Sequence, residues 1–274
     1  MFAPLNPRIN DWHGQRVWLV GASSGIGAAL AAALLQRGAR VALSARRAQA
    51  LDALAHGQSP ERARVVPMDV TDPGSVADAH RRVQAAWGGI DLTIWVAGTY
   101  TPMGTDQFRL DDALGVVRTN LDGVLNGLAV LLPVLRRERR GSIAIVSSVA
   151  GYRGLPKSLV YGPTKAALNN LAESLYLDMH PLGVGVYLIS PGFVRTPLTD
   201  LNDFSMPALI DPEDAARSIL AGFSRGAFEI HFPGRFTRVM KVLQMLPHRM
   251  YFALMRRFTR SDRGSARHAE DALR

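Results

Sequence analysis

The stretch that decides the fold reads Arg16-Val-Trp-Leu-Val20-Gly21-Ala-Ser-Ser-Gly25-Ile-Gly27. A short apolar run leads into three glycines, and an alanine- and leucine-rich segment follows as far as Gly38. This order predicts a strand, a tight turn and a helix that stops at Gly38. Glycine suits a backbone that turns sharply or approaches a ligand closely, and the start of a helix attracts a phosphate. An ordinary glycine-rich loop is the alternative, because the spacing is G-x-x-x-G-x-G and not G-x-G-x-x-G.

The second predicted strand, 40–44, runs into Ala45-Arg46-Arg47. In dinucleotide-binding sheets an acidic residue at this point binds the ribose 2′-hydroxyl, whereas an arginine accommodates a 2′-phosphate. Ala45 stands at the acidic position, so the sequence predicts NADP(H) in preference to NAD(H), which stays the alternative. Arg46 is the expected contact, with Arg47 beside it. The competing interpretation is that both arginines only keep a loop soluble.

Asp69-Val70 closes a third predicted strand and is a candidate for the adenine edge of a nucleotide. A helix cap is an equal alternative for Asp69, because Thr71-Asp72-Pro73 is a helix-start signal.

Further along, Tyr161 and Lys165 stand four residues apart, with Ser148 thirteen residues before the tyrosine. On a helix the i,i+4 spacing places the phenol and the ammonium on one face. A neighbouring cation favours the phenolate and lowers a tyrosine pKa that is otherwise about 10. A serine hydroxyl nearby would hold a carbonyl oxygen. Together the three residues suit proton transfer to a ketone oxygen, although the pair alone is also common by chance on a solvated helix.

Apolar runs recur at 16–20, 40–44, 63–67, 91–96, 142–146 and 184–190, with helical stretches between them. Such alternation predicts an α/β fold, a doubly wound parallel sheet with helices on both faces. We expect one catalytic domain over residues 1–234, followed by a basic amphipathic extension with a polar tail over 235–274.

In this order of motifs the chain resembles the short-chain dehydrogenase/reductase family, in its single-domain branch, from about Gly14 to Asp214. The elements are Gly21-Ala-Ser-Ser-Gly-Ile-Gly27, Asp69-Val70, Ala97-Gly98, Asn120, Ser148 with Tyr161 and Lys165, and Pro191-Gly192 with Thr196. The resemblance implies a Rossmann-like fold and a catalytic set of Asn120, Ser148, Tyr161 and Lys165. Ser148 would orient the carbonyl and Tyr161 would be the acid/base. Lys165 would lower the tyrosine pKa and hold the nicotinamide ribose, and Asn120 would anchor a water in a proton relay.

The expected cofactor contacts extend from the glycine turn to the segment after the sixth strand. They are Gly21, Ser23, Ser24, Gly25, Ile26, Gly27, Arg46, Arg47, Asp69, Val70, Ala97, Gly98, Tyr161, Lys165, Pro191, Gly192, Val194 and Thr196.

The chain departs from the pattern of that family at three places. Val20 replaces the usual threonine, and Trp95-Val96 replaces the usual Asn-Asn, which puts the contacts on the adenosine side in doubt. Pro163 inside the Tyr-x-x-x-Lys segment removes one helix donor, which is harmless only near a helix start.

Composition narrows the function further. The 274 residues contain no cysteine, which excludes disulfides and thiolate chemistry, and the seven histidines show no ligand-like spacing, so we expect no metal. The first residues lack the basic start and apolar run of a signal peptide, which predicts a cytoplasmic protein. The net charge is +9, but residues 235–274 hold ten Lys or Arg against three Asp or Glu, a balance of +7. Since the excess lies outside the catalytic body, nucleic acid is not an expected partner.

Residues 236–258 alternate apolar and basic side chains at helical spacing and are broken by Pro247, which predicts two amphipathic helices. A membrane span needs about 20 apolar residues, and five cations argue against one. The helices either contact a membrane surface or pack on the domain or on a second subunit. After Arg260 the composition turns polar, and a disordered end is expected.

Two loops, 150–159 and 193–209, are expected to frame the substrate. The second carries Leu198, Leu201, Phe204, Met206 and Leu209, which suit a lipophilic substrate or simply dock the loop to the core. Arg153 and Lys157 of the first are either contacts for an acidic group or exposed loop cations.

The apolar stretch Val124 to Leu135 is expected to pack on the sheet, and the family resemblance implies that this helix joins subunits in a homodimer or homotetramer.

The sequence therefore favours an NADP(H)-dependent oxidoreductase that interconverts a ketone and a secondary alcohol on a lipophilic small molecule. Two alternatives stay open: a membrane-surface reductase of 3-oxo lipids, and a non-catalytic NADP(H)-sensing protein.

Overall fold

The computed structural model describes residues 3–202 and 206–257. Its elements are β1 (Arg16–Val20), α1 (Gly25–Gln36), β2 (Arg40–Ser44), α2 (Ala48–Ala55), β3 (Ala63–Val65), α3 (Pro73–Trp87), β4 (Leu92–Trp95), α4 (Leu110–Val117), η1 (Arg118–Asp122), α5 (Gly123–Glu138), β5 (Ser142–Val146), η2 (Val149–Gly151), α6 (Tyr161–Met179), η3 (His180–Leu182), β6 (Gly185–Pro191), η4 (Thr199–Leu201), α7 (Pro212–Arg225), β7 (Glu229–Phe232) and α8 (Gly234–Met245). A further helical stretch covers 248–257.

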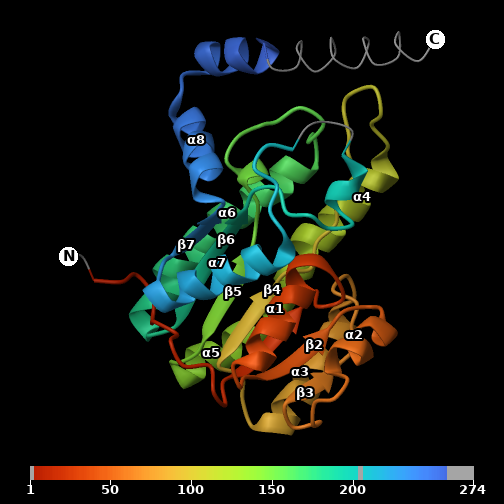
Figure 1. Cartoon of the computed structure of the whole chain (residues 1–274), viewed down its shortest axis with the longest axis vertical. Coiled ribbons are helices and arrows are strands. Elements are labelled where there is room, and N and C mark those ends of the chain that lie inside the picture. The colour runs from red at the N-terminus through yellow and green to blue at the C-terminus, as the bar shows by residue number, and fades with distance from the viewer. Residues whose placement is uncertain (1–2, 203–205, 258–274) are drawn as a thin grey trace.

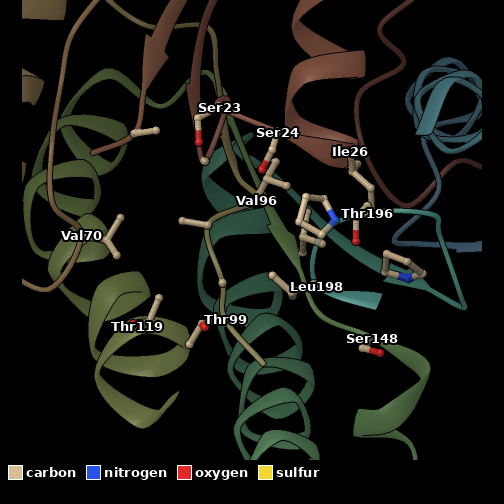
Figure 2. Close-up of a pocket in the computed structure, with 18 of the residues that line it drawn as sticks. Ser23, Ser24, Ile26, Val70, Val96, Thr99, Thr119, Ser148, Thr196 and Leu198 are labelled. Atoms are coloured by element: carbon tan, nitrogen blue, oxygen red, sulfur yellow. The ribbon is translucent and has the colours of Figure 1, made fainter. Parts of the chain in front are cut away.

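The strands form one seven-stranded sheet in the order β3-β2-β1-β4-β5-β6-β7, with every neighbouring pair parallel. The order reverses between β1 and β4, and at such a switch point the loops after the strands diverge and leave a crevice for a ligand. The cavity drawn in Figure 2 lies at these carboxyl ends. This is the doubly wound, Rossmann-like α/β fold expected from the alternating pattern.

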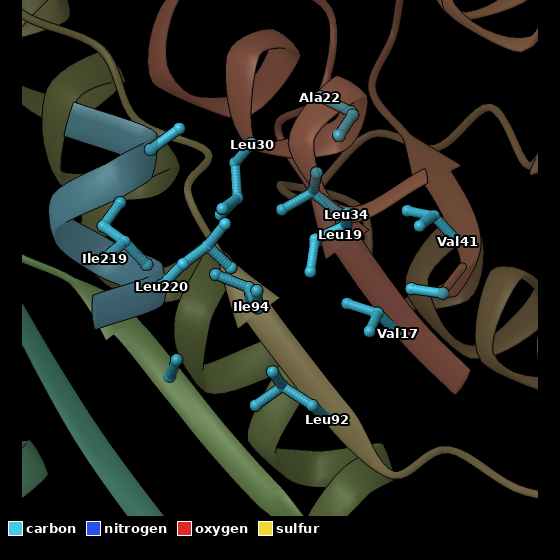
Figure 3. Close-up of a cluster of buried hydrophobic side chains, with 14 of the residues drawn as sticks. Val17, Leu19, Ala22, Leu30, Leu34, Val41, Leu92, Ile94, Ile219 and Leu220 are labelled. Atoms are coloured by element: carbon cyan, nitrogen blue, oxygen red, sulfur yellow. The ribbon is translucent and has the colours of Figure 1, made fainter. Parts of the chain in front are cut away.

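Apolar side chains fill both faces of the sheet. On one face α1, α2 and α7 pack on the strands, and Figure 3 shows Leu30 of α1 on the side toward Ile219 and Leu220 of α7, above Ile94 of β4. On the other face α3, α5 and α6 cover Ile145 and the neighbouring strands. Because both faces are covered, the strands read as continuous apolar runs and not as an alternation. The sheet therefore supports the loops that follow the carboxyl ends of its strands (Figure 1).

Six of the seven strands lie where the apolar runs predicted them, within a few residues. The seventh, β7, was missed because its sequence Glu229-Ile-His-Phe alternates charged or polar with apolar residues over only four positions. The start of α6 at Tyr161 also settles the question of Pro163. The proline stands in the first turn, where its missing N–H has no intrahelical acceptor to lose.

Val20 and Trp95, two of the residues that depart from the family pattern, lie in the hydrophobic core. Val20 is fully buried, and the Trp95 ring packs edge-on against Trp18 with a centroid distance of 6.1 Å. Gly127 on α5 makes room for this ring, because a Cβ at that position would overlap it. The cavity wall at this point is made by Val96, so Trp95 points away from the cavity.

The stretch from Val124 to Leu135 packs on the sheet as expected. Val124, Leu128, Leu131 and Leu135 of α5 are buried.

An N-terminal segment is hydrogen-bonded to the start of β6. Asn6 Nδ2 donates to the carbonyl of Val186 at 2.6 Å, and the Val186 N–H donates back to Asn6 Oδ1 at 2.8 Å. The Asn6 N–H also donates to the carbonyl of Gly226, and the Tyr187 hydroxyl donates to that of Pro7. These bonds hold residues 5–7 against β6 and the end of α7.

The C-terminal helices stand beyond the edge of the sheet at β7 (Figure 1). Thr237, Met240 and Tyr251 are buried against the body, whereas Val239, Val242, Met245, Met250 and Phe252 are exposed. The extension therefore packs on the body with one face and presents apolar side chains on another. Among the described residues, none of the helices has the length and apolar character that crossing a membrane requires. The predicted polar end after Arg260 lies outside the described residues.

Candidate active site

A cavity of about 710 Å³ opens at the carboxyl ends of the strands. Figure 2 shows Ser23, Ser24 and Ile26 at one end and Ser148 toward the other. Of the expected site residues, all but Gly27 and Asn120 line it. Sequence reasoning did not count as contacts the further lining residues, which are Ala45, Met68, Thr71, Val96, Thr99, Thr119, Val146, Ser147, Pro197, Leu198 and Thr199. Most of these stand one or two positions from a predicted residue, at the same strand ends.

The first end of the cavity is built from backbone. Gly21 has a φ of +93°, and a Cβ there would lie 2.7 Å from Ala97 Cα. Gly25 opens α1 with a φ of +53°, and a Cβ on Gly27 would overlap the carbonyl of Gly21. Gly21 thus lets the turn approach the chain just after β4, and Gly27 lets α1 pack closely on the turn. The first residues of α1 line the cavity. With no acidic residue in the first turn, this end suits a phosphate.

The two arginines after β2 both reach the wall of the cavity. Arg47 Nη2 lies 3.3 Å from Ser23 Oγ and 3.4 Å from the Ser23 carbonyl, beside the glycine turn. Arg46 lies near Asp69, whose pKa it helps to lower. Arg46 and Arg47 therefore form a basic rim of the cavity next to Ala45, which stands where an acidic residue is usual.

Asp69 is not the helix cap. The cap of α3 is Asp72, whose Oδ1 accepts from the N–H of Gly74 at 2.8 Å. Asp69 lines the cavity, and its Oδ1 accepts from the N–H and hydroxyl of Thr71. Burial raises the pKa of Asp69, but these bonds and the charge of Arg46 bring it below its ordinary value. The carboxylate is therefore ionised and fixed at the edge of the cavity.

The other end of the cavity is built from side chains. Tyr161 and Lys165 point from the first turns of α6, and the Lys165 Nζ lies 5.6 Å from the centre of the Tyr161 ring. The Ser148 hydroxyl is a hydrogen-bond partner of Tyr161 and also caps η2 by accepting from the N–H of Ala150 at 3.1 Å. Tyr100 packs edge-on against the Tyr161 ring with centroids 5.0 Å apart. The structure thus brings together the three residues that the sequence separated by up to seventeen positions.

The titration of this pair differs from the expectation. Burial raises the pKa of Tyr161 to about 12, against a hydrogen bond from Ser148 that lowers it. Burial likewise lowers the pKa of Lys165 to about 8. The ammonium is directed to the carbonyl of Val146 at 3.0 Å, so it does not offset the burial of the phenol. At neutral pH the tyrosine therefore carries its proton and is ready to donate it.

Asn120 lies behind the wall and not in it. It is fully buried in the π-helical turn η1, where its Oδ1 accepts from the N–H of Thr99 at 2.7 Å. Its Nδ2 donates to the carbonyl of Thr99 and to the hydroxyl of Thr164. The amide therefore ties the loop after β4 to the start of α6.

The two loops that were expected to frame the substrate have different surroundings. Leu198 lines the cavity, whereas Leu201 is exposed and Phe204 lies outside the described residues. Met206 and Leu209 are half-buried. In the other loop, Arg153 donates to carbonyls at the end of α8, so it is neither an exposed cation nor a contact for an acidic ligand. Sequence patterns gave no signal for this contact, because its partners stand about ninety residues away.

One cleft of this doubly wound sheet holds a glycine turn that suits a phosphate, two arginines after β2, and a buried tyrosine with a neighbouring lysine. This combination is typical of a dinucleotide-dependent oxidoreductase. Among the described residues there is no group of three or more His, Cys, Asp or Glu placed to hold a metal. A sequence profile described as "short chain dehydrogenase" matches residues 15–204. The chain belongs to the short-chain dehydrogenase/reductase family and is an NAD(P)-dependent dehydrogenase/reductase.

Individual relatives agree with this assignment. An uncharacterized oxidoreductase of Myxococcus xanthus is 35% identical over 241 residues, which cover 87% of this chain and 95% of the relative. A short-chain dehydrogenase/reductase of Burkholderia phymatum, solved in complex with NAD, has a TM-score of 0.77 at 22% identity and covers 85% of this chain and 94% of its own. ElxO, solved with NADP bound, has a TM-score of 0.71 at 23% identity and covers 80% and 97%. At these identities the two structures show a shared fold.

Proposed function

We propose that the protein is an NADP(H)-dependent oxidoreductase that interconverts a ketone and a secondary alcohol on a lipophilic small molecule. The observation that carries this proposal is the contact between Ser148 and Tyr161 beside Lys165, at the end of the cavity opposite the phosphate turn. The proposed catalytic domain is residues 1–234, with 235–274 as its extension.

The residues of the cavity fit a nicotinamide dinucleotide. The glycine turn, where a Cβ would collide with Ala97, leaves room for a pyrophosphate against the start of α1. Asp69 and Val70 would face the adenine, and Pro191, Gly192, Val194 and Thr196 would line the nicotinamide side. When bound, the nicotinamide supplies or accepts the hydride. Ala45 together with Arg46 and Arg47 at the adenosine rim supports NADP(H) over NAD(H).

The chain's own residues handle the proton. Ser148 would donate a hydrogen bond to the substrate oxygen, and Tyr161 would pass its proton to that oxygen during reduction. The high pKa of Tyr161 keeps the proton available at neutral pH. Lys165, with its pKa near 8, would share the negative charge that the phenol acquires and hold the ribose. Asn120 would keep Thr99 and α6 in register and support the proton relay.

The wall on the substrate side supports a lipophilic substrate. Val194, Pro197 and Leu198 bring apolar surface to the cavity, and Tyr100 covers the Tyr161 ring. An apolar wall beside a few fixed polar groups is the usual composition of a site for a small organic molecule.

The test is nicotinamide absorbance during incubation with ketones that range from short and polar to long-chain and cyclic. NADPH and NADH are run side by side with the wild type, Tyr161→Phe and a control, Tyr176→Phe, whose hydroxyl only donates to the carbonyl of Leu5. We expect oxidation of NADPH with one class of ketone, lost in Tyr161→Phe and kept in Tyr176→Phe. Tight NADPH binding without any turnover would instead favour the non-catalytic sensor.

A second candidate function is reduction of a 3-oxo lipid at a membrane surface. It is favoured by the exposed side chains Val242, Met245 and Phe252 on a segment that contains six cations and no acidic residue between 230 and 257. Co-sedimentation with anionic vesicles tests it, comparing the wild type with Val242→Ser/Met245→Ser. The control Leu110→Ser removes an equally exposed leucine from α4. If the wild type stays in the supernatant, this candidate fails.

A cytoplasmic location and a homodimer or homotetramer complete the proposal. Exposed Leu125 on α5 and Leu177 on α6 support contact between copies through these helices. Light scattering coupled to size-exclusion chromatography measures the mass directly, and a monomer would remove this part of the proposal.

A further inference from the structure

The loop between Ser148 and Tyr161 carries a proposed catalytic residue at each end, and the C-terminal extension holds its middle. Ser148 begins the short helix η2, and Tyr161 begins α6. Because both residues border this loop, a change in the path of the loop reaches both hydroxyl groups.

Arg153 is the main attachment of the loop. Its Nη1 donates toward the carbonyl oxygens of Leu243 at 2.9 Å, Gln244 at 3.0 Å and Leu246 at 2.5 Å. These carbonyls belong to the last turn of α8 and to its C-cap residue, where few N–H groups of the helix are left to donate to them and the helix dipole is negative. The guanidinium therefore meets a ready-made site for a cation.

The same arginine is covered by an aromatic ring. The guanidinium carbon lies 4.1 Å from the ring centre of Tyr251, a buried residue whose hydroxyl donates to the carbonyl of Gly154 at 2.5 Å. Residues 153 and 154 are thus held both by the end of α8 and by the helical stretch 248–257.

A second attachment holds the neighbouring residue. The Tyr152 hydroxyl donates to Glu229 Oε1 on β7, and Glu229 Oε2 pairs with Lys241 Nζ on α8 at 2.5 Å. Burial raises the pKa of Glu229, but the bonds from Lys241 and Tyr152 bring it below its ordinary value, so the carboxylate stays charged. The loop is therefore fixed to β7 and α8 through the carboxylate of Glu229.

We propose that the C-terminal extension is a positioning part of the active site, and that Arg153 transmits its position to the Ser148–Tyr161 pair. Neither Arg153 nor Tyr251 lines the cavity, so both act through the loop and not on the substrate. The inference rests on the proposed roles of Ser148 and Tyr161. It predicts that the extension changes turnover without changing the affinity for the cofactor.

The first experiment compares Arg153→Met, Arg153→Lys and a control, Arg249→Met, which removes an exposed arginine from the same extension. A small misplacement of reacting groups lowers rates by about tenfold to a hundredfold, so Arg153→Met is expected to lower kcat by at least about tenfold. The Kd for NADPH is expected to stay within about twofold, because the phosphate end of the cavity is untouched. Arg153→Lys is expected to recover part of kcat, and Arg249→Met to match the wild type.

The ratio of turnover to cofactor binding separates positioning from general loss of structure. A protein that is only partly unfolded loses kcat and NADPH-binding sites in the same proportion, whereas a misplaced pair of hydroxyl groups loses kcat alone. The number of NADPH sites per chain is therefore measured for each variant beside kcat. A kcat in folded Arg153→Met equal to that of the wild type, or a loss of NADPH sites as large as the loss of kcat, would overturn the proposal.

Hydrogen exchange tests the loop without any substrate. In Arg153→Met the amides of residues 149–160 are expected to exchange about tenfold faster, while those of β1 and β5 keep their rates. Unchanged exchange in the loop overturns the positioning role even if no ketone is ever turned over. Loss of activity in the wild type would in contrast count only against the proposed reaction.

Discussion

The two ends of the cavity are made of different material. The proposed phosphate end consists of backbone, namely three glycines and the first N–H groups of α1. The proposed carbonyl end consists of side chains, namely the hydroxyl groups of Ser148 and Tyr161 and the ammonium of Lys165. A backbone site is damaged by adding atoms, whereas a side-chain site is damaged by removing them. The comparison therefore predicts opposite classes of harmful substitution at the two ends of the cavity.

The largest effect is expected where one oxygen is removed from the carbonyl end. Ser148→Ala is expected to lower kcat by about 10²- to 10³-fold, the usual effect of deleting one donor to a developing oxyanion. Ser147→Ala is the control, since that hydroxyl donates to the carbonyl of Lys165. Equal kcat in both variants would remove the distinction between the two serines.

The corresponding change at the phosphate end is the addition of one methyl group. Gly21→Ala combines a left-handed backbone with overlap against Ala97, and these effects together cost about 2–5 kcal/mol of stability. Gly115→Ala, in α4 with open space around it, is expected to be neutral or slightly stabilising. Chemical denaturation of both variants measures the difference. A Gly21→Ala protein as stable as Gly115→Ala would show that the turn has room to relax.

Replacing Lys165 is expected to change activity and stability in opposite directions, with lower turnover and a higher free energy of unfolding. Its pKa falls from 10.5 to about 8 on burial, which corresponds to about 3 kcal/mol of destabilisation below about pH 8, where the lysine is protonated in both the folded and the unfolded chain. Lys165→Met is therefore expected to lower turnover and to raise the melting temperature at pH 7.

The pH dependence gives the sign of this effect. Between pH 8 and 10 the unfolded chain keeps the lysine proton and the folded chain releases it, so wild-type stability rises with pH relative to Lys165→Met. A constant difference across this window would mean that the lysine is hydrated in the folded protein.

The smallest effect is expected at the adenosine rim. Arg46→Gln is predicted to weaken NADPH binding about tenfold and NADH binding little, because one charged contact to a phosphate is worth about 1.5–3 kcal/mol at most. Arg47→Gln serves as the comparison, since Arg47 already contacts Ser23. Fluorescence titration with both cofactors measures the four affinities. If NADH binding fell as far as NADPH binding, neither arginine would contact a 2′-phosphate.

These two ends also differ in how far the sequence revealed them. The glycine turn and the strands around it are local, so residues 16–27 alone predicted a strand, a turn and a helix. The tyrosine and lysine were equally readable, because four residues on one helix fix their relation. Their pKa values were not, since burial depends on Tyr100, Val146 and other residues far along the chain.

The regions that the sequence left open are those held by single long-range contacts. β7 carries too few apolar residues to stand out, and it becomes a strand because β6 offers it an edge. The role of Arg153 depends on the end of a helix ninety residues later. Amphipathic spacing predicted the C-terminal helices, but only the fold shows which face is buried.

The side chain of Asn6 has a practical consequence for anyone who transplants this active site. It accepts from and donates to the peptide of Val186 as a neighbouring strand would, and Gly226 leaves space for its backbone. A chimera that exchanged only residues 15–204 with a relative would separate β6 from the side chain of Asn6. The N–H and the carbonyl of the residue at position 186 would then need new hydrogen-bond partners. The unit that can be moved between proteins intact therefore begins at least nine residues before the family match does.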